Sequence, residues 1–189
     1  QSNLRPWTYE SLDKNSAGWS ARYGGDLEGL IAKSDYLLEL GITGLKLNPI
    51  LGAPSAAKYD VTDYENVDPE FGGNEAFTDL LAEADRRNLR IVIDGVFNHC
   101  GERHPFFRDA VQRGPESPKY SWFNFLKWPL PPRLEGNGPN APSNYYECWW
   151  GFGGLPAWNT RNPEVREYLM GSAERWTRAG IDGWRLDAA

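Results

Sequence analysis

Apolar residues recur along the chain with the spacing of helices that bury one face. Three stretches share this i, i+3, i+4 pattern: 26–41, 74–87 and 162–180. Asp26, Asn74 and Asn162 stand where such helices begin, and their side chains are good N-caps. Pro163 and Gly180 suit the first turn and the end of the third stretch. We therefore predict three amphipathic helices.

Short apolar runs lie between the helical stretches, at 44–50, 90–97 and 181–187. The run at 90–97 is almost continuously apolar, which is typical of a strand buried on both faces of a parallel sheet. Strands that alternate with helices predict right-handed βαβ units. The pattern alone leaves open a (β/α)8 barrel and a doubly wound sheet. A barrel needs about 250 residues, so a barrel would extend beyond these 189 residues.

The stretch 98–160 has no clear periodicity and is rich in Pro, Gly and aromatic residues. Its aromatic cluster is too dense for a solvated linker: Trp122, Phe123, Trp128, Tyr145, Tyr146, Trp149 and Trp150. A connection of this length is usually functional or an inserted unit. We expect a small subdomain over the carboxyl end of the sheet that narrows a cleft. The predicted division is 1–97, 98–160 and 161–189.

Composition excludes several classes of partner. The net charge of −6 argues against nucleic acid, which favours a basic surface. An apolar run of about 18 residues and a signal peptide are both missing from the sequence, so no membrane partner is expected. Cys100 and Cys148 lack metal-site spacing, and we interpret them as free thiols, which mildly favours the cytoplasm. The nine Trp suit a large core and also the apolar faces of sugars.

Polar residues collect where the predicted strands end: Asn48, Asp94, Asn98, His99, Arg185 and Asp187. Sites in α/β folds are built at the carboxyl ends of the strands. Side chains alternate along a strand, so Gly183, Arg185 and Asp187 should share one face and Asp94 and Asn98 another. These strand ends are therefore the place to expect chemistry.

Arg185 and Asp187 have two interpretations. A guanidinium beside a carboxylate keeps it ionised, as a carboxylate nucleophile at an anomeric carbon requires. The same spacing also fits a structural ion pair. Asp94 is either a substrate ligand or a buried carboxylate that orients Arg185. A single histidine after a strand, such as His99, is more often structural than a ligand.

Several motifs together resemble the α-amylase family. "DGVFNH" at 94–99 resembles its first signature region and "GWRLDAA" at 183–189 its second. "LPAWN" at 155–159 stands where the family has Leu/Met-Pro-Lys-Leu-Asn. The stretches 23–30, 47–50 and 58–77 are similar to the neopullulanase, cyclomaltodextrinase and maltodextrin glucosidase branch. The resemblance covers nearly the whole chain in the family's order.

The resemblance implies a partial (β/α)8 TIM barrel. Strands 2, 3 and 4 would be 44–48, 90–97 and 181–187, with strand 1 before Gln1 and 98–160 as the B domain. The implied activity is retaining hydrolysis of α-1,4 bonds, with α-1,6 as an option, in maltodextrins, cyclodextrins or pullulan. The family's Glu acid/base would lie after Ala189. The isolated segment is then expected to be inactive, and either to aggregate or to be molten.

Carried over position by position, Asp187 matches the nucleophile and Arg185 the arginine that keeps it ionised. Tyr59 matches the tyrosine that stacks on the sugar at the cleavage subsite. His99 matches the histidine that hydrogen-bonds that sugar, and Asp94 matches the supporting aspartate. The resemblance therefore assigns two catalytic and three substrate-binding residues.

Gly24 and Asp26 match calcium ligands of some branch members, although part of that ligand set would precede Gln1. The chemistry itself requires no cofactor, and a homodimer is an option for the full-length enzyme. Ala157-Trp158 replaces the usual Lys-Leu, which obscures the choice among branch members. The alternatives are a non-catalytic amylase-like module and a transglycosylase or isomerase on the same scaffold.

Overall fold

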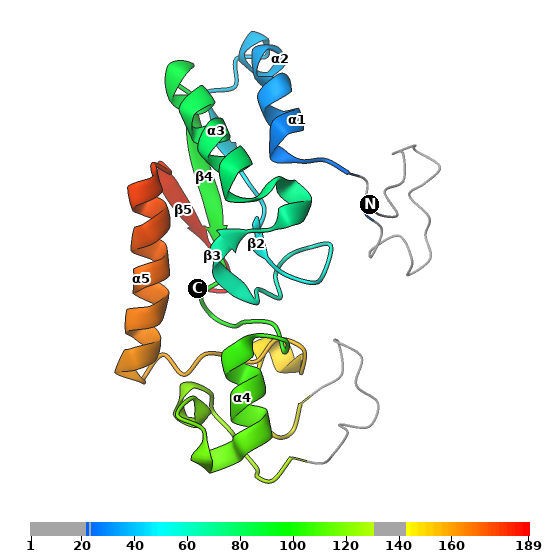
Figure 1. Cartoon of the computed structure of the whole chain (residues 1–189), viewed down its shortest axis with the longest axis vertical. Coiled ribbons are helices and arrows are strands. Elements are labelled where there is room, and N and C mark those ends of the chain that lie inside the picture. The colour runs from blue at the N-terminus through cyan, green and yellow to red at the C-terminus, as the bar shows by residue number, and fades with distance from the viewer. Residues whose placement is uncertain (1–21, 23, 131–142) are drawn as a thin grey trace.

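The computed structural model describes residues 22, 24–130 and 143–189. Its centre is a three-stranded parallel sheet in the order β1-β4-β5 (Figure 1). The strands are β1 (Gly44–Lys46), β4 (Arg90–Gly95) and β5 (Gly183–Leu186). All three predicted strands are confirmed, each shorter than its apolar run. Ile91 and Ile93 of the middle strand are fully buried, as its composition predicted.

The first helical stretch forms two helices, so the prediction of a single helix over 26–41 is wrong. They are α1 (Leu27–Ala32) and α2 (Ser34–Glu39), and Asp26 caps α1 by accepting from the Gly29 N–H at 2.7 Å. The Ser34 hydroxyl donates to the Ile31 carbonyl at 2.7 Å. A serine that bonds the preceding turn competes with the helical backbone pattern, and the helix is interrupted there.

The other two helices begin differently from each other. In α5 (Pro163–Ala179) the Asn162 side chain accepts from the Glu164 N–H at 2.9 Å and Gly180 ends the helix, as predicted. In α3 (Gly73–Arg86) the N-cap is Gly72, so the prediction of Asn74 is wrong. The Asn74 side chain instead accepts from the Val67 N–H at 2.8 Å and ties the helix to the preceding strand.

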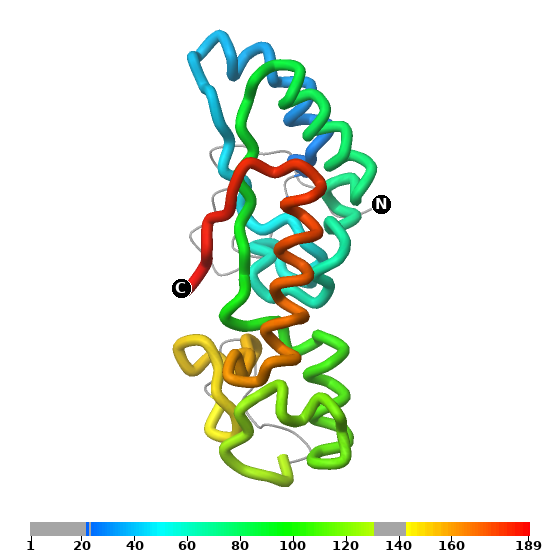
Figure 2. The backbone as a smooth tube through the Cα atoms, turned by 90° about the vertical axis from the view of Figure 1, so that its left-hand side faces the viewer, coloured from blue at the N-terminus to red at the C-terminus, as the bar shows by residue number. Residues whose placement is uncertain are grey.

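Three helices lie on the same side of the sheet. Figure 2 shows α1, α3 and α5 on one side and the strands β1, β4 and β5 along the other. The buried face of α5 comprises Val165, Leu169, Ser172 and Trp176, as its spacing predicted. A doubly wound sheet carries helices on both faces, so the described residues do not have that architecture.

A second sheet lies in a stretch that showed no strand pattern. It is an antiparallel pair of β2 (Leu51–Gly52) and β3 (Asp63–Val67), followed by the short 3-10 helix η3 (Pro69–Phe71). The β3 sequence, DYENV, has too few apolar positions to reveal alternation. This small sheet holds the segment 53–62 between its strands.

The described part of 98–160 extends beyond the carboxyl end of β4 (Figure 1). It contains one α-helix and three 3-10 helices: α4 (Pro105–Arg113), η4 (Gly114–Glu116), η5 (Tyr120–Trp122) and η6 (Trp149–Gly151). Phe107 packs edge-on against Phe123 and Tyr146, each with ring centroids 4.9 Å apart. Aromatic side chains therefore form the interior of this segment.

Cys100 and Cys148 are both free, as predicted. Within the described residues, none of the helices combines the length and apolar character needed to span a membrane.

Candidate active site

The central contact of the site follows from strand register. In the parallel pair of β4 and β5, Asp94 is the register partner of Arg185. Arg185 Nη1 donates to Asp94 Oδ1 at 2.9 Å and to Oδ2 at 3.1 Å. The expectation that Asp94 and Arg185 occupy different faces is wrong, because residues in register project to the same side of a sheet. Asn98 lies beyond the end of β4.

Arg185 also contacts the carboxylate that ends the strand. Its Nη1 donates to Asp187 Oδ1 at 2.6 Å, so one guanidinium nitrogen joins two carboxylates. The Asp187 backbone N–H donates to the Gly95 carbonyl at 3.0 Å, which fixes the residue at the end of β4. Hydrogen bonds that Arg185 donates to Asp94 and then to Asp187 raise the pKa of Arg185 further above its usual range. Arg185 therefore stays cationic at every working pH.

Asp94 is the most enclosed member of the site, with a fully buried side chain. Besides Arg185, its Oδ2 accepts from Lys46 Nζ at 2.8 Å and from the Tyr59 hydroxyl at 3.2 Å. A carboxylate offers about four lone-pair positions, and protein donors make four contacts here. This saturation favours the interpretation of Asp94 as a residue that orients its neighbours over that of a substrate ligand.

Lys46 belongs to this site but sequence reasoning missed it. Its Nζ donates to Asp94 and also to Asn48 Oδ1 at 2.9 Å. A charged residue within the apolar run of β1 was the available signal, since an unpaired charge there is costly. Lys46 supplies the second cation that compensates the buried carboxylate.

His99 combines deep burial with an unpartnered ring nitrogen. The residue is 1% exposed, and its Nδ1 lies 3.3 Å from Asn98 Nδ2. Among buried side-chain nitrogen and oxygen atoms in the described part of the chain, only His99 Nε2 has no hydrogen-bond partner. Burial lowers the pKa of His99, and the charge of Asp187 and a backbone contact at Tyr59 offset this in part, so the neutral ring is favoured. A satisfied structural histidine does not match this geometry, because buried polar atoms are nearly always paired.

Tyr59 is half-buried and meets the site through its hydroxyl. Burial, followed by the Asp94 carboxylate, raises the pKa of Tyr59 and keeps the phenol protonated as a donor. Direct contacts thus connect Tyr59, Asp94, Arg185 and Asp187 in that order. His99 packs against the Trp149 ring, with centroids 5.8 Å apart. Four of the five predicted site residues are thus joined by direct contacts at the carboxyl end of the sheet, and His99 lies near enough to Asp187 for that charge to act on its ring.

The two candidate calcium ligands lie elsewhere, at the start of α1. One carboxylate oxygen of Asp26 is the helix cap described above. The described residues contain no group of three or more His, Cys, Asp or Glu side chains arranged to hold a metal ion. Gly24 has a φ of 82°, which glycine adopts easily. Calcium binding at Gly24 and Asp26 stays a prediction.

These features define a polar site at the ends of parallel strands, built around an arginine–carboxylate pair. The chain belongs to the α-amylase family: residues 7–189 match the family described as "Alpha amylase, catalytic domain".

Named relatives agree with this assignment. Neopullulanase 2 of Thermoactinomyces vulgaris is 42% identical over 167 residues, which are 88% of this chain and 27% of that protein. Intracellular maltogenic amylase of Bacillus subtilis (strain 168) is 39% identical over 188 residues, 99% of this chain and 29% of that protein. The chain thus spans less than a third of the length of these relatives.

Solved structures give the same picture. The cyclic alpha-maltosyl-(1→6)-maltose hydrolase from Arthrobacter globiformis, in complex with maltose, superposes with a TM-score of 0.82 at 38% sequence identity. The match covers 89% of this chain and 37% of that one.

Proposed function

We propose that this chain is part of a retaining glycoside hydrolase that cleaves α-glucosidic bonds in glucans. The observation that carries the proposal is the contact of Arg185 with Asp187 at the end of β5, 2.6 Å long. The guanidinium places a positive charge and a hydrogen-bond donor against the Asp187 carboxylate, and a carboxylate is the nucleophile of a retaining glycosidase. Family membership gives the pair a catalytic meaning that its spacing alone does not.

The surrounding residues suit a sugar at the reacting position. The Tyr59 ring offers an aromatic surface for the apolar face of a pyranose, and its hydroxyl is occupied by Asp94. The free His99 Nε2 would pair with a sugar hydroxyl and remove the cost of an unsatisfied buried atom. Asp94 orients the Arg185 guanidinium through two hydrogen bonds. We assign no acid/base carboxylate among the described residues, because Asp94 is buried and saturated.

We propose that β1, β4 and β5 are the second, third and fourth strands of a (β/α)8 barrel. Helices on one face of a parallel sheet support this, because a barrel places them outside and fills its interior with side chains. In the same arrangement 98–160 is the B domain after the third strand, with 1–97 and 161–189 in the barrel. The location of the described part of 98–160 beyond the end of β4 supports this division.

The names of the relatives given above support a substrate class. They refer to pullulan, to the formation of maltose and to a cyclic maltosyl-maltose. We propose α-1,4-linked maltodextrins and cyclodextrins, with α-1,6 bonds of pullulan as a further substrate. We also propose a cytoplasmic location, which free Cys100 and Cys148 suit. A homodimer stays a prediction.

A non-catalytic amylase-like module is the main alternative. It has no reason to keep Tyr59, His99, Arg185 and Asp187 together, and least of all an unpartnered buried His99 Nε2. A transglycosylase would use the same residues and differ only in the acceptor.

The test is product analysis of the protein expressed from the full reading frame that contains this sequence. Maltotriose, cyclodextrin, pullulan and starch would be supplied, and the anomeric form of the first product followed by NMR. We expect glucose and maltose with the α configuration retained. Absence of turnover on all four substrates would contradict the proposal, and longer oligosaccharides as main products would indicate transglycosylation.

A further inference from the structure

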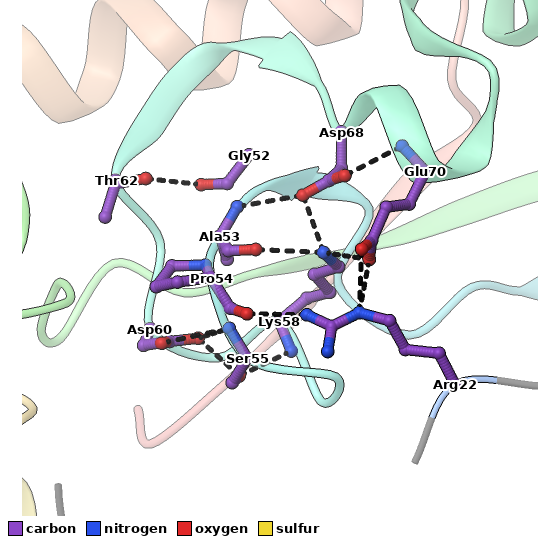
Figure 3. Close-up of polar contacts among 10 residues, drawn as sticks. All are labelled: Arg22, Gly52, Ala53, Pro54, Ser55, Lys58, Asp60, Thr62, Asp68 and Glu70. Carbon is purple, nitrogen blue, oxygen red and sulfur yellow. Dashed lines mark hydrogen bonds and ion pairs between the residues drawn. The ribbon is translucent and has the colours of Figure 1, made fainter. Parts of the chain in front are cut away.

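A buried lysine directly precedes the residue proposed to stack on the sugar. The Lys58 side chain is 3% exposed, which is rare for lysine unless it is paired. Its Nζ donates to Asp68 Oδ2 at 2.7 Å, to Glu70 Oε2 at 2.8 Å and to the Ala53 carbonyl at 2.9 Å (Figure 3). All three protons of the ammonium group are therefore used.

The backbone at Lys58 is also unusual, with a φ of 61°. This left-handed conformation costs a residue with a side chain about 1 kcal/mol or more. It directs neighbouring side chains to different places: Lys58 to Asp68 and Glu70, and Tyr59 to Asp94. The ion pairs stabilise a turn that the backbone alone disfavours.

A buried ion pair is a poor source of stability, because desolvation of the charges offsets most of their attraction. Replacement by apolar side chains is often neutral for stability. Burial raises the pKa of Asp68, but the hydrogen bond from Lys58 and two backbone N–H groups outweigh it and leave the pKa lowered. Asp68 therefore stays ionised, and the value of its contact with Lys58 lies in the fixed geometry.

Other contacts close the same turn. Ser55 Oγ accepts from the Lys58 N–H at 3.1 Å, and its own hydroxyl donates to the Asp60 carboxylate. On the far side, a Cβ at Gly101 would collide with the Asp60 carbonyl, so the chain after His99 packs directly on this backbone. Arg22 forms an ion pair with Glu70 and donates a hydrogen bond to the Pro54 carbonyl at 2.6 Å (Figure 3).

The Tyr59 side chain is half-buried and packs against the hydrophobic core, and its polar contact is one hydrogen bond to Asp94, 3.2 Å long. Such packing on one part of a half-buried ring does not fix it alone, so its orientation also depends on the backbone on either side of it. That backbone is held chiefly by the three Lys58 contacts and by the Ser55–Asp60 pair.

We propose that Lys58 is a positioning residue for Tyr59. Its ion pairs with Asp68 and Glu70 lock the left-handed turn that presents the Tyr59 ring beside Asp94, and thereby set the affinity for the sugar on that ring. The second half of this statement rests on the proposed glucan activity, whereas the first concerns the ring alone.

The kinetic test uses Lys58→Met in the full reading-frame protein, with maltotriose as substrate. We expect the KM to rise about tenfold and kcat to change less than about threefold, because uniform binding is lost. In a Tyr59→Ala background the same substitution should change KM less than about twofold. Equal effects in both backgrounds, or an unchanged KM, would overturn the proposal. Arg87→Met, which breaks another largely buried ion pair, with Glu83 on α3, is the matched control and should leave KM unchanged.

A second readout does not depend on activity. The Tyr59 signal in a spectrum of ring-13C-labelled tyrosine would be identified by its loss in Tyr59→Ala. It should shift in Lys58→Met and stay in place in Arg87→Met, and a fixed signal in Lys58→Met would refute positioning. If Lys58→Met does not fold, Glu70→Gln serves instead, because its side chain is 46% exposed. If the wild-type protein does not turn over maltotriose, the proposed function is contradicted. The Tyr59 ring signal then still decides whether Lys58 positions the ring.

Discussion

Asp94→Asn separates the two interpretations of the most buried carboxylate in the site. The asparagine keeps the shape but replaces one acceptor oxygen by an NH2 group. Asp94 accepts from Arg185, Lys46 and Tyr59, with three of the four contacts on Oδ2 and one on Oδ1. The amide therefore loses at least one contact, and Arg185 and Lys46 both lose the negative charge that they face. An orienting residue and a substrate ligand predict different consequences for the kinetics.

The loss of stability can be worked from these contacts. A buried hydrogen bond to a charged group contributes about 1.5–3 kcal/mol. The Arg185 and Lys46 side chains are 43% and 38% exposed, so water replaces part of what they lose. Taking the lower value for two contacts gives a loss of about 3 kcal/mol in the free energy of unfolding. Denaturant titration of wild type and variant measures this difference.

The kinetic effect should fall on kcat. Arg185 keeps its hydrogen bond to Asp187 but loses the Asp94 carboxylate that orients its guanidinium. We therefore expect kcat to fall by about 10- to 100-fold, or ~1.4–2.8 kcal/mol. KM for maltotriose should rise less than about threefold, because the turn at Lys58 still holds the Tyr59 ring. Tyr59→Phe, which removes only the hydroxyl contact, is the control with near-normal kcat. A variant with normal kcat and strongly raised KM would refute the orienting role.

Three further predictions concern different parts of the chain. Asp187→Asn should lower the rate at least about a thousandfold, roughly 4 kcal/mol, with little change in KM. Arg185→Ala removes the hydrogen bond to Asp187 and should also lower kcat, and an unchanged kcat would count against the pair. Burial lowers the pKa of His104 to about 4, so between pH 6.5 and 4 this histidine gains a proton only in the unfolded state. The free energy of unfolding should therefore fall by about 3 kcal/mol as the pH is lowered across that window. The fall should be smaller in His104→Asn, and denaturant titrations at several pH values measure it. Trp150, 85% exposed and stacked on Trp149, should affect glucan length preference: Trp150→Ala should raise KM for maltohexaose but not for maltotriose, at unchanged stability. Equal KM changes for both substrates would argue against this role.

The sequence predicted the elements whose signals are local. The cap, first-turn proline and terminal glycine of α5 all function as expected, because each acts within one helical turn. The helix break at Lys33 was not predictable from periodicity, since the apolar spacing continues through it. The β2–β3 pair escaped notice because β2 has only two residues and β3 is largely polar, so neither shows an alternating pattern.

The site was predicted where the family motifs lie and missed where the contacts are tertiary. Asp94, Arg185 and Asp187 were identified together, but only the register of β4 and β5 reveals that one guanidinium joins both carboxylates. Lys46 comes from a third strand. The role of Lys58 depends on a side-chain network that no sequence spacing encodes.

The central claim is that Asp187 forms a bond to the substrate. The direct measurement is mass spectrometry of the full reading-frame protein after reaction with a 5-fluoro-α-maltosyl fluoride. The ring fluorine slows formation and hydrolysis of the intermediate, and fluoride leaves without a proton donor. We predict a peptide carrying the fluoromaltosyl group on Asp187, and no label in Asp187→Asn. A label on any other carboxylate would contradict the account and return Arg185 and Asp187 to the status of a structural ion pair.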